Sequence, residues 1–237
     1  MIRARDYDAI GFDVYGTILD WEPEVADFLE TWAAQNNLSV TRQKLMEVYD
    51  CLRQPLQEER PALRYPEVLK QTFDAMAKEF GMPAPVGQRD DFGEIAAKHK
   101  PFPDSAAALG ALKSMGFTLA ALTNVDDRSF ERAAKSANIS FDVIVTAQRV
   151  GAYKPDHTHF LAALSDLLAL EIPQSRVLHV AQSRRADIVP ANALGLTCVW
   201  INRPGHIFGR TGSGAETAKP DYETDSLAGF VALLEED

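Results

Sequence analysis

Cysteine is scarce in this sequence, and no long apolar stretch occurs. Only two of the 237 residues are cysteine, Cys51 and Cys198. Two isolated cysteines exclude a disulfide framework and a thiolate metal site, so we expect both to be buried, reduced thiols. No apolar run approaches the ~20 residues of a membrane-spanning helix. Because residues 1–6 also lack the apolar stretch of a signal peptide, we expect a cytoplasmic protein with no membrane partner.

Basic residues are outnumbered by acidic ones. The chain has 24 lysines and arginines against 34 aspartates and glutamates, for a formal net charge of −10. This balance argues against a nucleic-acid partner. An anionic small molecule stays compatible with it, because a few donors converging in a cleft outweigh a distant net charge. The composition, 46% apolar and 24% charged, is that of a globular protein long enough to bury a substantial core.

The stretch that follows residue 8 ends in a carboxylate. Apolar residues from Ala9 to Phe12 precede Asp13, the chain turns at Gly16, and Thr17 follows. This pattern is typical of a buried strand that delivers a side chain to the edge of a sheet. Asp13 is therefore a candidate nucleophile, since an aspartate can attack an electrophilic carbon or phosphorus and form a covalent intermediate. The alternative is that Asp13 only caps a turn.

Residues 20–97 show the apolar spacing of helices. The expected helices are Trp21 to Asn36, about Thr41 to Leu52, and Pro66 to Phe80. Pro55 is expected to stop the second of them. We expect this segment to be a helical cap inserted after the first strand, where it would cover Asp13. Its apolar stripes can pack on the core, on each other or on a second subunit.

Strand and helix patterns alternate from Pro101 onward. The expected strands are Thr118–Leu122, Phe141–Thr146, Val177–Ala181 and Thr197–Ile201, with helical patterns between them. This alternation predicts an α/β protein with a parallel sheet covered on both faces by helices. Ligands of such folds gather beyond the carboxyl ends of the strands. The glycine-rich segment 205–219 is expected to be a mobile surface loop.

Polar residues stand where four of the strands end. They are Asp13, then Thr123 and Asn124, then Lys154, then Gln182 and Asp187. In a parallel sheet all of them face one crevice. Lys154 would hold Asp13 ionised, and Asp187 is suited to orient or deprotonate a water. Thr123 and Asn124 offer donors to an anion. Each residue also has a structural alternative, as a turn or helix cap or as a solvated lysine.

The ordered set resembles a known family. The motif Asp13-x-Tyr15-Gly16-Thr17, followed by Thr123-Asn124, Lys154-Pro155 and Asp187, resembles the haloacid dehalogenase superfamily, in particular its type II 2-haloacid dehalogenase group. The likeness covers essentially the whole chain, including the phrase Trp200-Ile201-Asn202-Arg203. The segment that begins at Arg42 is similar to the one carrying the family's halide-binding arginine. The resemblance therefore implies that Arg42 receives the halide, and it also suggests a homodimer.

One position separates carbon from phosphorus chemistry in this superfamily. Its phosphatases carry a second aspartate two residues after the nucleophile, where this chain has Tyr15. That aspartate protonates a leaving alkoxide, whereas a halide leaves as a stable anion and needs no proton. The phosphatases also hold Mg²⁺ with carboxylates of the first and last motifs. With Tyr15 in the first motif and only Asp187 in the last, we expect no metal and no other cofactor.

The last motif departs from the best-known dehalogenases. Where they have Ser-x-Asn, this chain has Gln182-Ser183-Arg184. Gln182 is a candidate for positioning water in place of a hydroxyl. Arg184 either binds a carboxylate or lies outside the pocket. His179, in an apolar strand, is expected to be a hydrogen-bonded core residue outside the site.

The resemblance implies a hydrolase with a Rossmann-like core, residues 1–19 and 98–237, and a helical cap, residues 20–97. Its expected substrate is a short 2-haloalkanoic acid. Asp13 would displace halide from C2 with inversion, and water would then hydrolyse the aspartyl ester to release a 2-hydroxy acid. The alternatives are a phosphatase or related hydrolase of the same superfamily, and a non-catalytic binding protein of the same fold.

Each candidate residue has an expected role in this reaction. Thr17 and Lys154 would hold the attacking carboxylate. Thr123 and Asn124 would hold the substrate carboxylate and place C2 about 3 to 3.5 Å from the Asp13 oxygen. Tyr15 would supply an apolar wall, and Asp187 with Gln182 would handle the hydrolytic water.

Overall fold

The structure is a computed structural model that describes residues 2–206, 208 and 215–235. Its strands are β1 Ala9–Phe12, β2 Leu19–Asp20, β3 Lys100–Pro101, β4 Thr118–Thr123, β5 Val143–Thr146, β6 Val177–Ala181, β7 Thr197–Ile201 and β8 Tyr222–Thr224. Its α-helices are α1 Glu22–Gln35, α2 Arg42–Glu58, α3 Tyr65–Phe80, α4 Val86–Gly93, α5 Ser105–Ser114, α6 Asp127–Ala137, α7 Ala147–Val150, α8 Thr158–Ala169, α9 Val189–Ala193 and α10 Leu227–Glu235.

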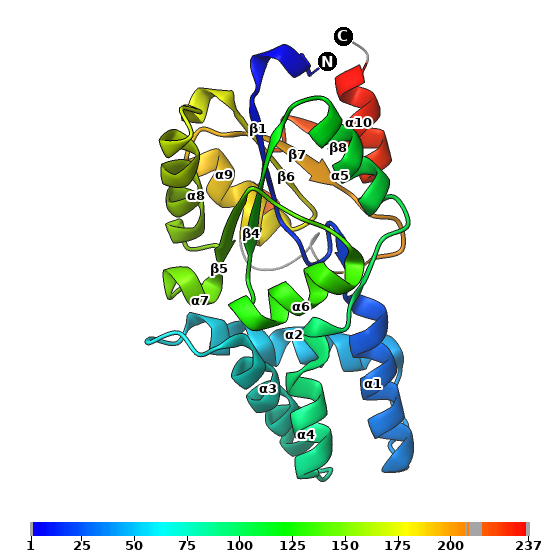
Figure 1. The fold of residues 1–237 in the computed structure, drawn as a ribbon. Coiled ribbons are helices and arrows are strands. Elements are labelled where there is room, and N and C mark those ends of the chain that lie inside the picture. The colour runs from blue at the N-terminus through cyan, green and yellow to red at the C-terminus, as the bar shows by residue number, and fades with distance from the viewer. Residues whose placement is uncertain (1, 207, 209–214, 236–237) are drawn as a thin grey trace.

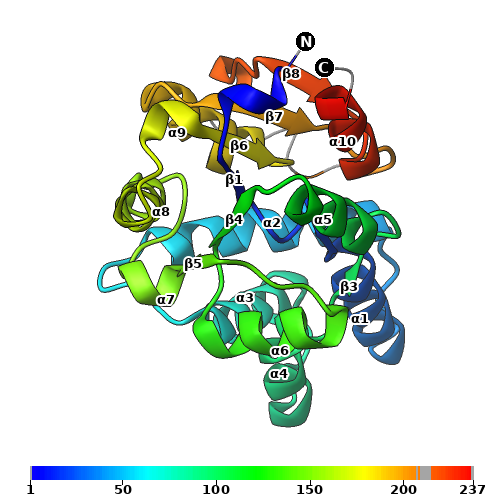
Figure 2. The ribbon, with the colours of Figure 1, turned by 45° about the horizontal axis from the view of Figure 1, so that its top comes forward.

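A six-stranded sheet forms the centre of the described part of the chain. Its strand order is β5-β4-β1-β6-β7-β8, and every neighbouring pair is parallel. Helices α8 and α9 lie on one side of the sheet and α5 and α10 on the other (Figures 1 and 2). The predicted α/β fold with helices on both faces is confirmed, and β1 lies in the middle of the sheet.

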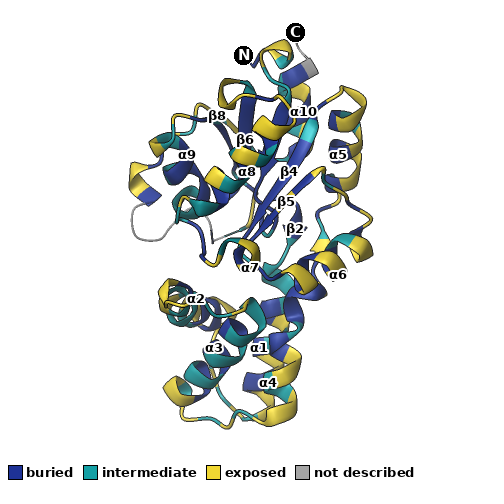
Figure 3. Cartoon of the chain, turned by 60° about the vertical axis from the view of Figure 1, so that its left-hand side comes forward, coloured by how far each residue is buried: buried dark blue, intermediate teal, exposed yellow. Residues whose placement is uncertain are grey.

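Strand β1 is buried along its whole length, and its neighbours β4 and β6 are buried almost throughout (Figure 3). Because side chains alternate across a strand, Ile10 and Phe12 join the apolar cluster on the α5 and α10 side, and Ala9 joins the cluster around α8 and α9. Gly11 shares the face of Ala9. The two faces of β1 thus bury apolar groups on both sides, and the strand presents its next residue, Asp13, at the carboxyl edge.

Helices α1 to α4, which we call the cap helices, lie beyond the carboxyl ends of the strands (Figure 1). The chain enters this region through β2 and returns through β3, and the two short strands pair antiparallel. The expected division of the chain, before residue 20 and after residue 97, falls close to this pair. The apolar stripe of α3 is buried within the chain, with Phe73 packed against Trp32 and Phe92.

Direct polar contacts join the cap helices to the sheet region. The Tyr153 hydroxyl, after β5, donates to the Leu63 carbonyl before α3 at 2.7 Å. Arg185, after β6, forms an ion pair of 3.0 Å with Glu58 at the end of α2. These contacts tie the carboxyl edge of the sheet to the end of α2.

Two local expectations were wrong. Helix α2 does not stop before Pro55 but continues to Glu58. A proline removes its own N–H and crowds the carbonyl four residues earlier. The turn that follows Pro55 nevertheless packs against α3, since Leu56 contacts the apolar cluster that contains Val68, and this packing helps to offset the lost bond. Cys198 is buried as expected, but Cys51 is exposed on α2.

Part of segment 205–219 lies outside the described residues, so its expected mobility stays a prediction. Phe208 within it is buried. No helix in the described ranges combines the length and the apolar composition that crossing a membrane requires.

Candidate active site

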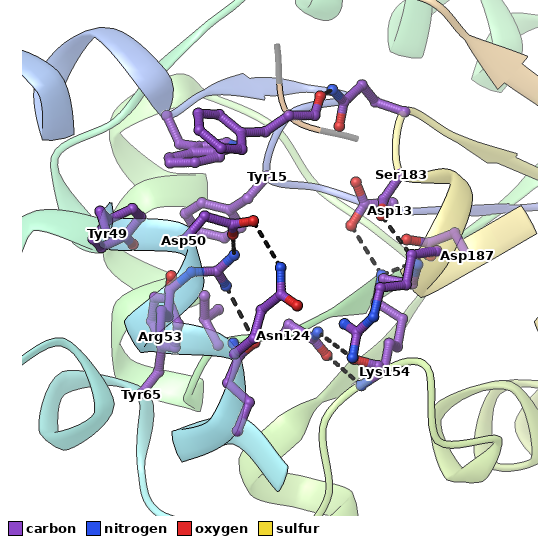
Figure 4. Close-up of a pocket in the computed structure, with 18 of the residues that line it drawn as sticks. Asp13, Tyr15, Tyr49, Asp50, Arg53, Tyr65, Asn124, Lys154, Ser183 and Asp187 are labelled. Carbon is purple, nitrogen blue, oxygen red and sulfur yellow. Dashed lines mark hydrogen bonds and ion pairs between the residues drawn. The ribbon is translucent and has the colours of Figure 1, made fainter. Parts of the chain in front are cut away.

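A cavity of about 120 Å³ lies between the carboxyl edge of the sheet and the cap helices (Figure 4). The sheet side contributes Asp13, Asn124, Lys154, Gln182 and Asp187 to its lining. The cap side contributes Trp21, Tyr49, Asp50, Arg53 and Tyr65. Pockets for drug-sized ligands enclose about 300–1,000 Å³. The cavity therefore suits a small molecule.

The carboxylate of Asp13 is held by both oxygens. The Thr17 hydroxyl donates to Oδ2 at 2.7 Å, and the Lys154 ammonium donates to Oδ1 at 2.9 Å. The backbone N–H of Asp13 donates to the Val180 carbonyl at 3.1 Å, which anchors the residue to β6. Asp13 is 6% exposed and lines the cavity. It is an oriented, nearly dry carboxylate with access to a small ligand.

The turn after Asp13 requires a glycine. Gly16 has a φ of +100°, and a Cβ there would lie 2.8 Å from Gln182 Oε1. The turn brings Thr17 back to Asp13, and the Thr17 hydroxyl accepts a hydrogen bond from the Gln182 N–H at 2.8 Å. Gln182 also donates through its side-chain amide to the Phe208 carbonyl. Gln182 thus lines the cavity and holds the turn.

Lys154 uses all three protons of its ammonium group. Nζ donates to Oδ1 of Asp13, to Oδ1 of Asp187 at 2.7 Å and to the Leu122 carbonyl at 2.7 Å. The Asn124 side chain holds the Lys154 backbone: its Oδ1 accepts from the Lys154 N–H at 2.7 Å, and its Nδ2 donates to the Lys154 carbonyl at 3.0 Å. Asn124 also lines the cavity, and its Nδ2 carries a second N–H, so its expected role as a substrate donor stays a prediction beside this structural one.

The three buried charges influence one another. Burial raises the pKa of Asp13, and the nearby Asp187 adds to the rise, although Lys154 and Thr17 oppose it. Burial acts the same way on Asp187, but Lys154 and His179 together hold the pKa of Asp187 below its usual value. Burial disfavours the Lys154 ammonium, yet the two carboxylates raise its pKa overall. The surroundings therefore favour the ionised form of Asp187, whereas they disfavour the ionised form of Asp13.

The two oxygens of Asp187 differ. Oδ1 accepts from Lys154 and from Nε2 of His179 at 3.1 Å. Oδ2 is buried and has no hydrogen-bond partner among the described residues. Asp187 lies in a turn of π-helix, Arg184–Ile188, directly after β6. This turn aims the carboxylate back at the end of β1.

Two of the expected ligand groups lie outside the cavity lining, and so does Arg184, for which this was one of two expected alternatives. Arg42 is on the surface, where it pairs with Asp27 and Glu30 of α1. The expectation that Arg42 receives the halide is therefore wrong for this structure. Thr123 is fully buried beneath the cavity and does not line it. Arg184 lies over the Trp200 ring at 5.2 Å and also faces away.

Arg53 is the residue that sequence reasoning missed. It lines the cavity from α2, with its guanidinium carbon 5.5 Å from the Tyr49 ring centre and 6.0 Å from that of Trp21. Its Nη2 donates to Asp50 at 2.6 Å, while Nε has no partner among the described residues. The spacing of Tyr49, Arg53 and Gln57, four residues apart along one helix face, was the signal available.

The side chains present do not fit a divalent metal. The carboxylates of Asp13 and Asp187 are bridged by the Lys154 ammonium, which occupies the place between them. The Tyr15 hydroxyl donates to the Ala96 carbonyl at 3.0 Å. Among the described residues, no three histidine, cysteine, aspartate or glutamate side chains come together as a metal-binding group. These contacts favour a site that works without a metal, and metal independence stays a prediction.

The fold and site define a Rossmann-like α/β protein with an oriented aspartate at the end of a central strand and a lysine bonded to it at the same edge of the sheet. The chain belongs to the haloacid dehalogenase-like hydrolase family, whose model matches residues 7–195. The resemblance read from the sequence motifs is thus confirmed at the level of the family.

Named relatives extend over nearly the whole chain. An (S)-2-haloacid dehalogenase of Pseudomonas sp. (strain YL) is 29% identical over 233 residues, which cover 95% of this chain and 94% of that protein. A haloacetate dehalogenase of Moraxella sp. (strain B) is 27% identical over 234 residues, covering 97% and 99%. A crystal structure of an L-2-haloacid dehalogenase has a TM-score of 0.80 and 25% identity, covering 98% of this chain and 100% of that one.

Proposed function

We propose that this protein hydrolyses the carbon–halogen bond of short 2-haloacids and releases halide and a 2-hydroxy acid. The observation that carries the proposal is the Asp13 carboxylate, held by Thr17 and Lys154 at the wall of a small cavity with no second acid two residues later. The names of the relatives point to the same chemistry. The helical segment 20–97 would be the cap that closes this site.

The first step is a displacement at carbon. An oxygen of Asp13 attacks C2 from the side opposite the halogen, forming the C–O bond of an ester while the halide leaves with the bonding electrons. Back-side attack inverts the configuration at C2. Thr17 and Lys154 keep the carboxylate in one orientation. The displacement then becomes an effectively unimolecular step within the enzyme–substrate complex. The small volume of the cavity limits the number of competing water molecules.

The second step is ester hydrolysis. Water adds to the side-chain carbonyl carbon of Asp13 and passes one proton to Oδ2 of Asp187, the oxygen without a partner among the described residues. When the tetrahedral intermediate collapses, the ester C–O bond breaks and the leaving oxygen takes up that proton. Asp187 is then a carboxylate again. Asp13 keeps the second hydrogen of the water as a carboxylic acid and returns to a carboxylate by releasing that proton to solvent. Gln182 lines the cavity beside them and is suited to hold the water.

Arg53 takes the part that was expected of Arg42. It is the guanidinium at the cavity wall on the cap side, and the free Nε leaves it a donor for an anion. Trp21 and Tyr49 confine it from two sides. A carboxylate or a departing halide in the cavity gains from this positive charge, because charge-assisted hydrogen bonds are strong where water is excluded.

A phosphatase reaction lacks its proton donor at this site. The residue two positions after Asp13 is Tyr15, whose hydroxyl is bonded to the Ala96 carbonyl. Burial raises the pKa of Tyr15 well above its usual value, so the phenol is a poor acid for a leaving alkoxide. A halide needs no such donor.

A substrate panel tests the proposal. The purified protein is assayed with 2-chloropropionate, chloroacetate, fluoroacetate and an aryl phosphate, and halide and phosphate release are measured. We expect halide release from at least one haloacid and no phosphate. A single turnover in H₂¹⁸O is expected to leave label in the Asp13 carboxylate. Phosphate release without halide would favour the phosphatase, and label in the product alone would contradict the ester intermediate.

A further inference from the structure

His179 is a buried histidine that the reaction described above does not use. It lies in β6, is 1% exposed, and places Nε2 3.1 Å from Oδ1 of Asp187. A buried polar side chain needs a partner. The partner of His179 is the carboxylate that we propose activates water.

We propose that His179 is a positioning residue for ester hydrolysis: it donates Nε2–H to Oδ1 of Asp187, which commits that oxygen and leaves Oδ2 to the attacking water. This inference rests on the proposed function. The unequal oxygens of Asp187 carry it, since Oδ1 accepts from both His179 and Lys154 while Oδ2 is buried without a partner among the described residues.

The surroundings of His179 keep its ring in place. The Phe160 ring of α8 stands edge-on to it, with ring centres 4.9 Å apart. On the neighbouring strand, Gly11 has no side chain, and a Cβ there would lie 3.2 Å from Nδ1 of His179. A longer residue at position 11 would push the ring. The absence of a side chain at Gly11 therefore gives the imidazole the room it needs beneath Asp187.

Lys154 and His179, the two donors to Oδ1 of Asp187, affect different steps of the reaction. Lys154 also holds Asp13, so it serves both the displacement and the hydrolysis. His179 contacts Asp187 but is not among the residues that line the cavity. Loss of His179 should leave the attack of Asp13 on C2 intact and slow the later step, in which Oδ2 takes a proton from water. This separation distinguishes positioning from a purely structural role.

The charged groups around Asp187 set its titration together. Lys154 and His179 touch it, Asp13 interacts with it across the lysine, and His159 on α8 senses its charge. Replacing His179 by an apolar residue removes one donor and leaves the other groups in place. The pKa of Asp187 should then rise, because the ionised form loses a hydrogen bond.

The experiment compares three variants. His179→Leu removes the donor, and His179→Gln keeps an N–H at nearly the position of Nε2. His159→Leu is the matched control: it removes another buried histidine with a bond of similar length, 3.2 Å to the Thr123 carbonyl, which does not touch Asp187. Each variant is first checked for folding by thermal unfolding. Rapid-quench assays then follow halide release and the mass of the aspartyl ester.

We expect His179→Leu to slow ester hydrolysis at least tenfold, a fraction of the 10²–10⁴ that a general base contributes. The halide burst should stay within about twofold of the native rate, so the ester accumulates. His179→Gln should restore most of the hydrolysis rate. His159→Leu should lower stability without changing the ratio of the two steps. Equal slowing of both steps in His179→Leu, or no slowing, would overturn the inference.

A second measurement separates this inference from the proposed function. The ¹³C chemical shift of the labelled Asp187 carboxyl is titrated in the native protein and in His179→Leu, with no substrate present. An unchanged titration midpoint overturns the contact, whatever the enzyme turns over. Failure of every haloacid in the substrate panel, combined with a raised midpoint in His179→Leu, would instead reject the proposed reaction and keep the role of His179 in holding Asp187.

Discussion

The two sides of the cavity are built differently. On the sheet side, Asp13, Lys154 and Asp187 are each at most 6% exposed and are tied to one another by bonds of 2.7 to 2.9 Å. On the cap side, aromatic rings surround Arg53, whose side chain is 18% exposed. The sheet side is a closed network of charges. The cap side combines aromatic rings with the Arg53–Asp50 ion pair, and Nε of Arg53 has no partner among the described residues.

This difference assigns different tasks to the two sides. Groups on strand ends are fixed by the sheet, so they can hold a nucleophile within the small tolerance that bond formation demands. Groups on the cap helices are held by side-chain packing, which suits recognition of a ligand's shape and charge. Substitutions on the sheet side should therefore change the rate of chemistry, and those on the cap side should change affinity.

Asp13→Asn should have the largest effect on activity. Without the nucleophile, we expect the turnover rate to fall by at least ~10⁴-fold. Stability should not fall, because burial raises the pKa of Asp13, so its ionised form costs folding free energy above the ordinary pKa of ~3.9. Halide release and thermal unfolding measure the two quantities. Substantial turnover by a pure, sequence-verified variant would remove Asp13 from the mechanism.

Lys154→Met should destabilise the protein as well as inactivate it. Removing the ammonium leaves two buried carboxylates without a counter-charge, which costs about 3–5 kcal/mol of unfolding free energy near neutral pH. The folded-state pKa values of both carboxylates then rise. The cost is therefore present above pH ~4 and shrinks as the carboxyls become protonated at lower pH. Urea unfolding at several pH values checks this. A stability gap that widens toward acid would contradict it.

Arg53→Met and Arg42→Met form a matched pair on one helix. Arg53→Met should raise KM for a haloacid about tenfold or more, since a hydrogen bond to a charged group contributes about 1.5–3 kcal/mol. Arg42→Met should leave kcat and KM nearly unchanged, because Arg42 bonds to Pro23, Asp27 and Glu30 of α1 and does not line the cavity. Steady-state kinetics with one substrate compares them. The reverse ranking would restore Arg42 as the anion-binding residue.

Removal of divalent metal ions should have the smallest effect on the rate of halide release. Because Lys154 stands between the two carboxylates, we expect the halide-release rate to survive EDTA within experimental error. The control is a parallel assay with added Mg²⁺. Activity lost to EDTA and restored by Mg²⁺ would show that the sheet side holds a cation after all.

Much of the sheet side was predictable because parallel strands end at one edge. Asp13 and Lys154 are 141 positions apart in the sequence and meet at 2.9 Å. Continuous apolar runs mark β1, β4, β6 and β7, and the polar residue after each run marks the edge. The contact of the Asn124 side chain with the Lys154 backbone was not predictable from the sequence. An amide at a strand end offers the same donors to a substrate as to the Lys154 backbone, and only the three-dimensional path of the loop decides between them.

The cap side was harder to predict. Arg42 and Arg53 are 11 residues apart, about three helical turns, so they share one face of α2 at positions roughly 16 Å apart along the axis. The periodicity of the sequence predicts which face of α2 an arginine lies on, but it does not predict which end of the helix lies next to the cavity. His179 was expected to be a bonded core residue, and its burial is confirmed. Its partner depends on the π-helical turn that returns Asp187 to the strand, which no local pattern announces.

The antiparallel pairing of β2 with β3 makes the two joints of residues 20–97 immediate neighbours. A different helical unit could be spliced between Leu19 and Lys100 without altering the path of any strand in the large sheet. A two- or three-residue linker across the same gap would leave the large sheet with its carboxyl edge uncovered. Replacing the helices between β2 and β3 would therefore change the substrate range while the catalytic residues on the sheet stay the same.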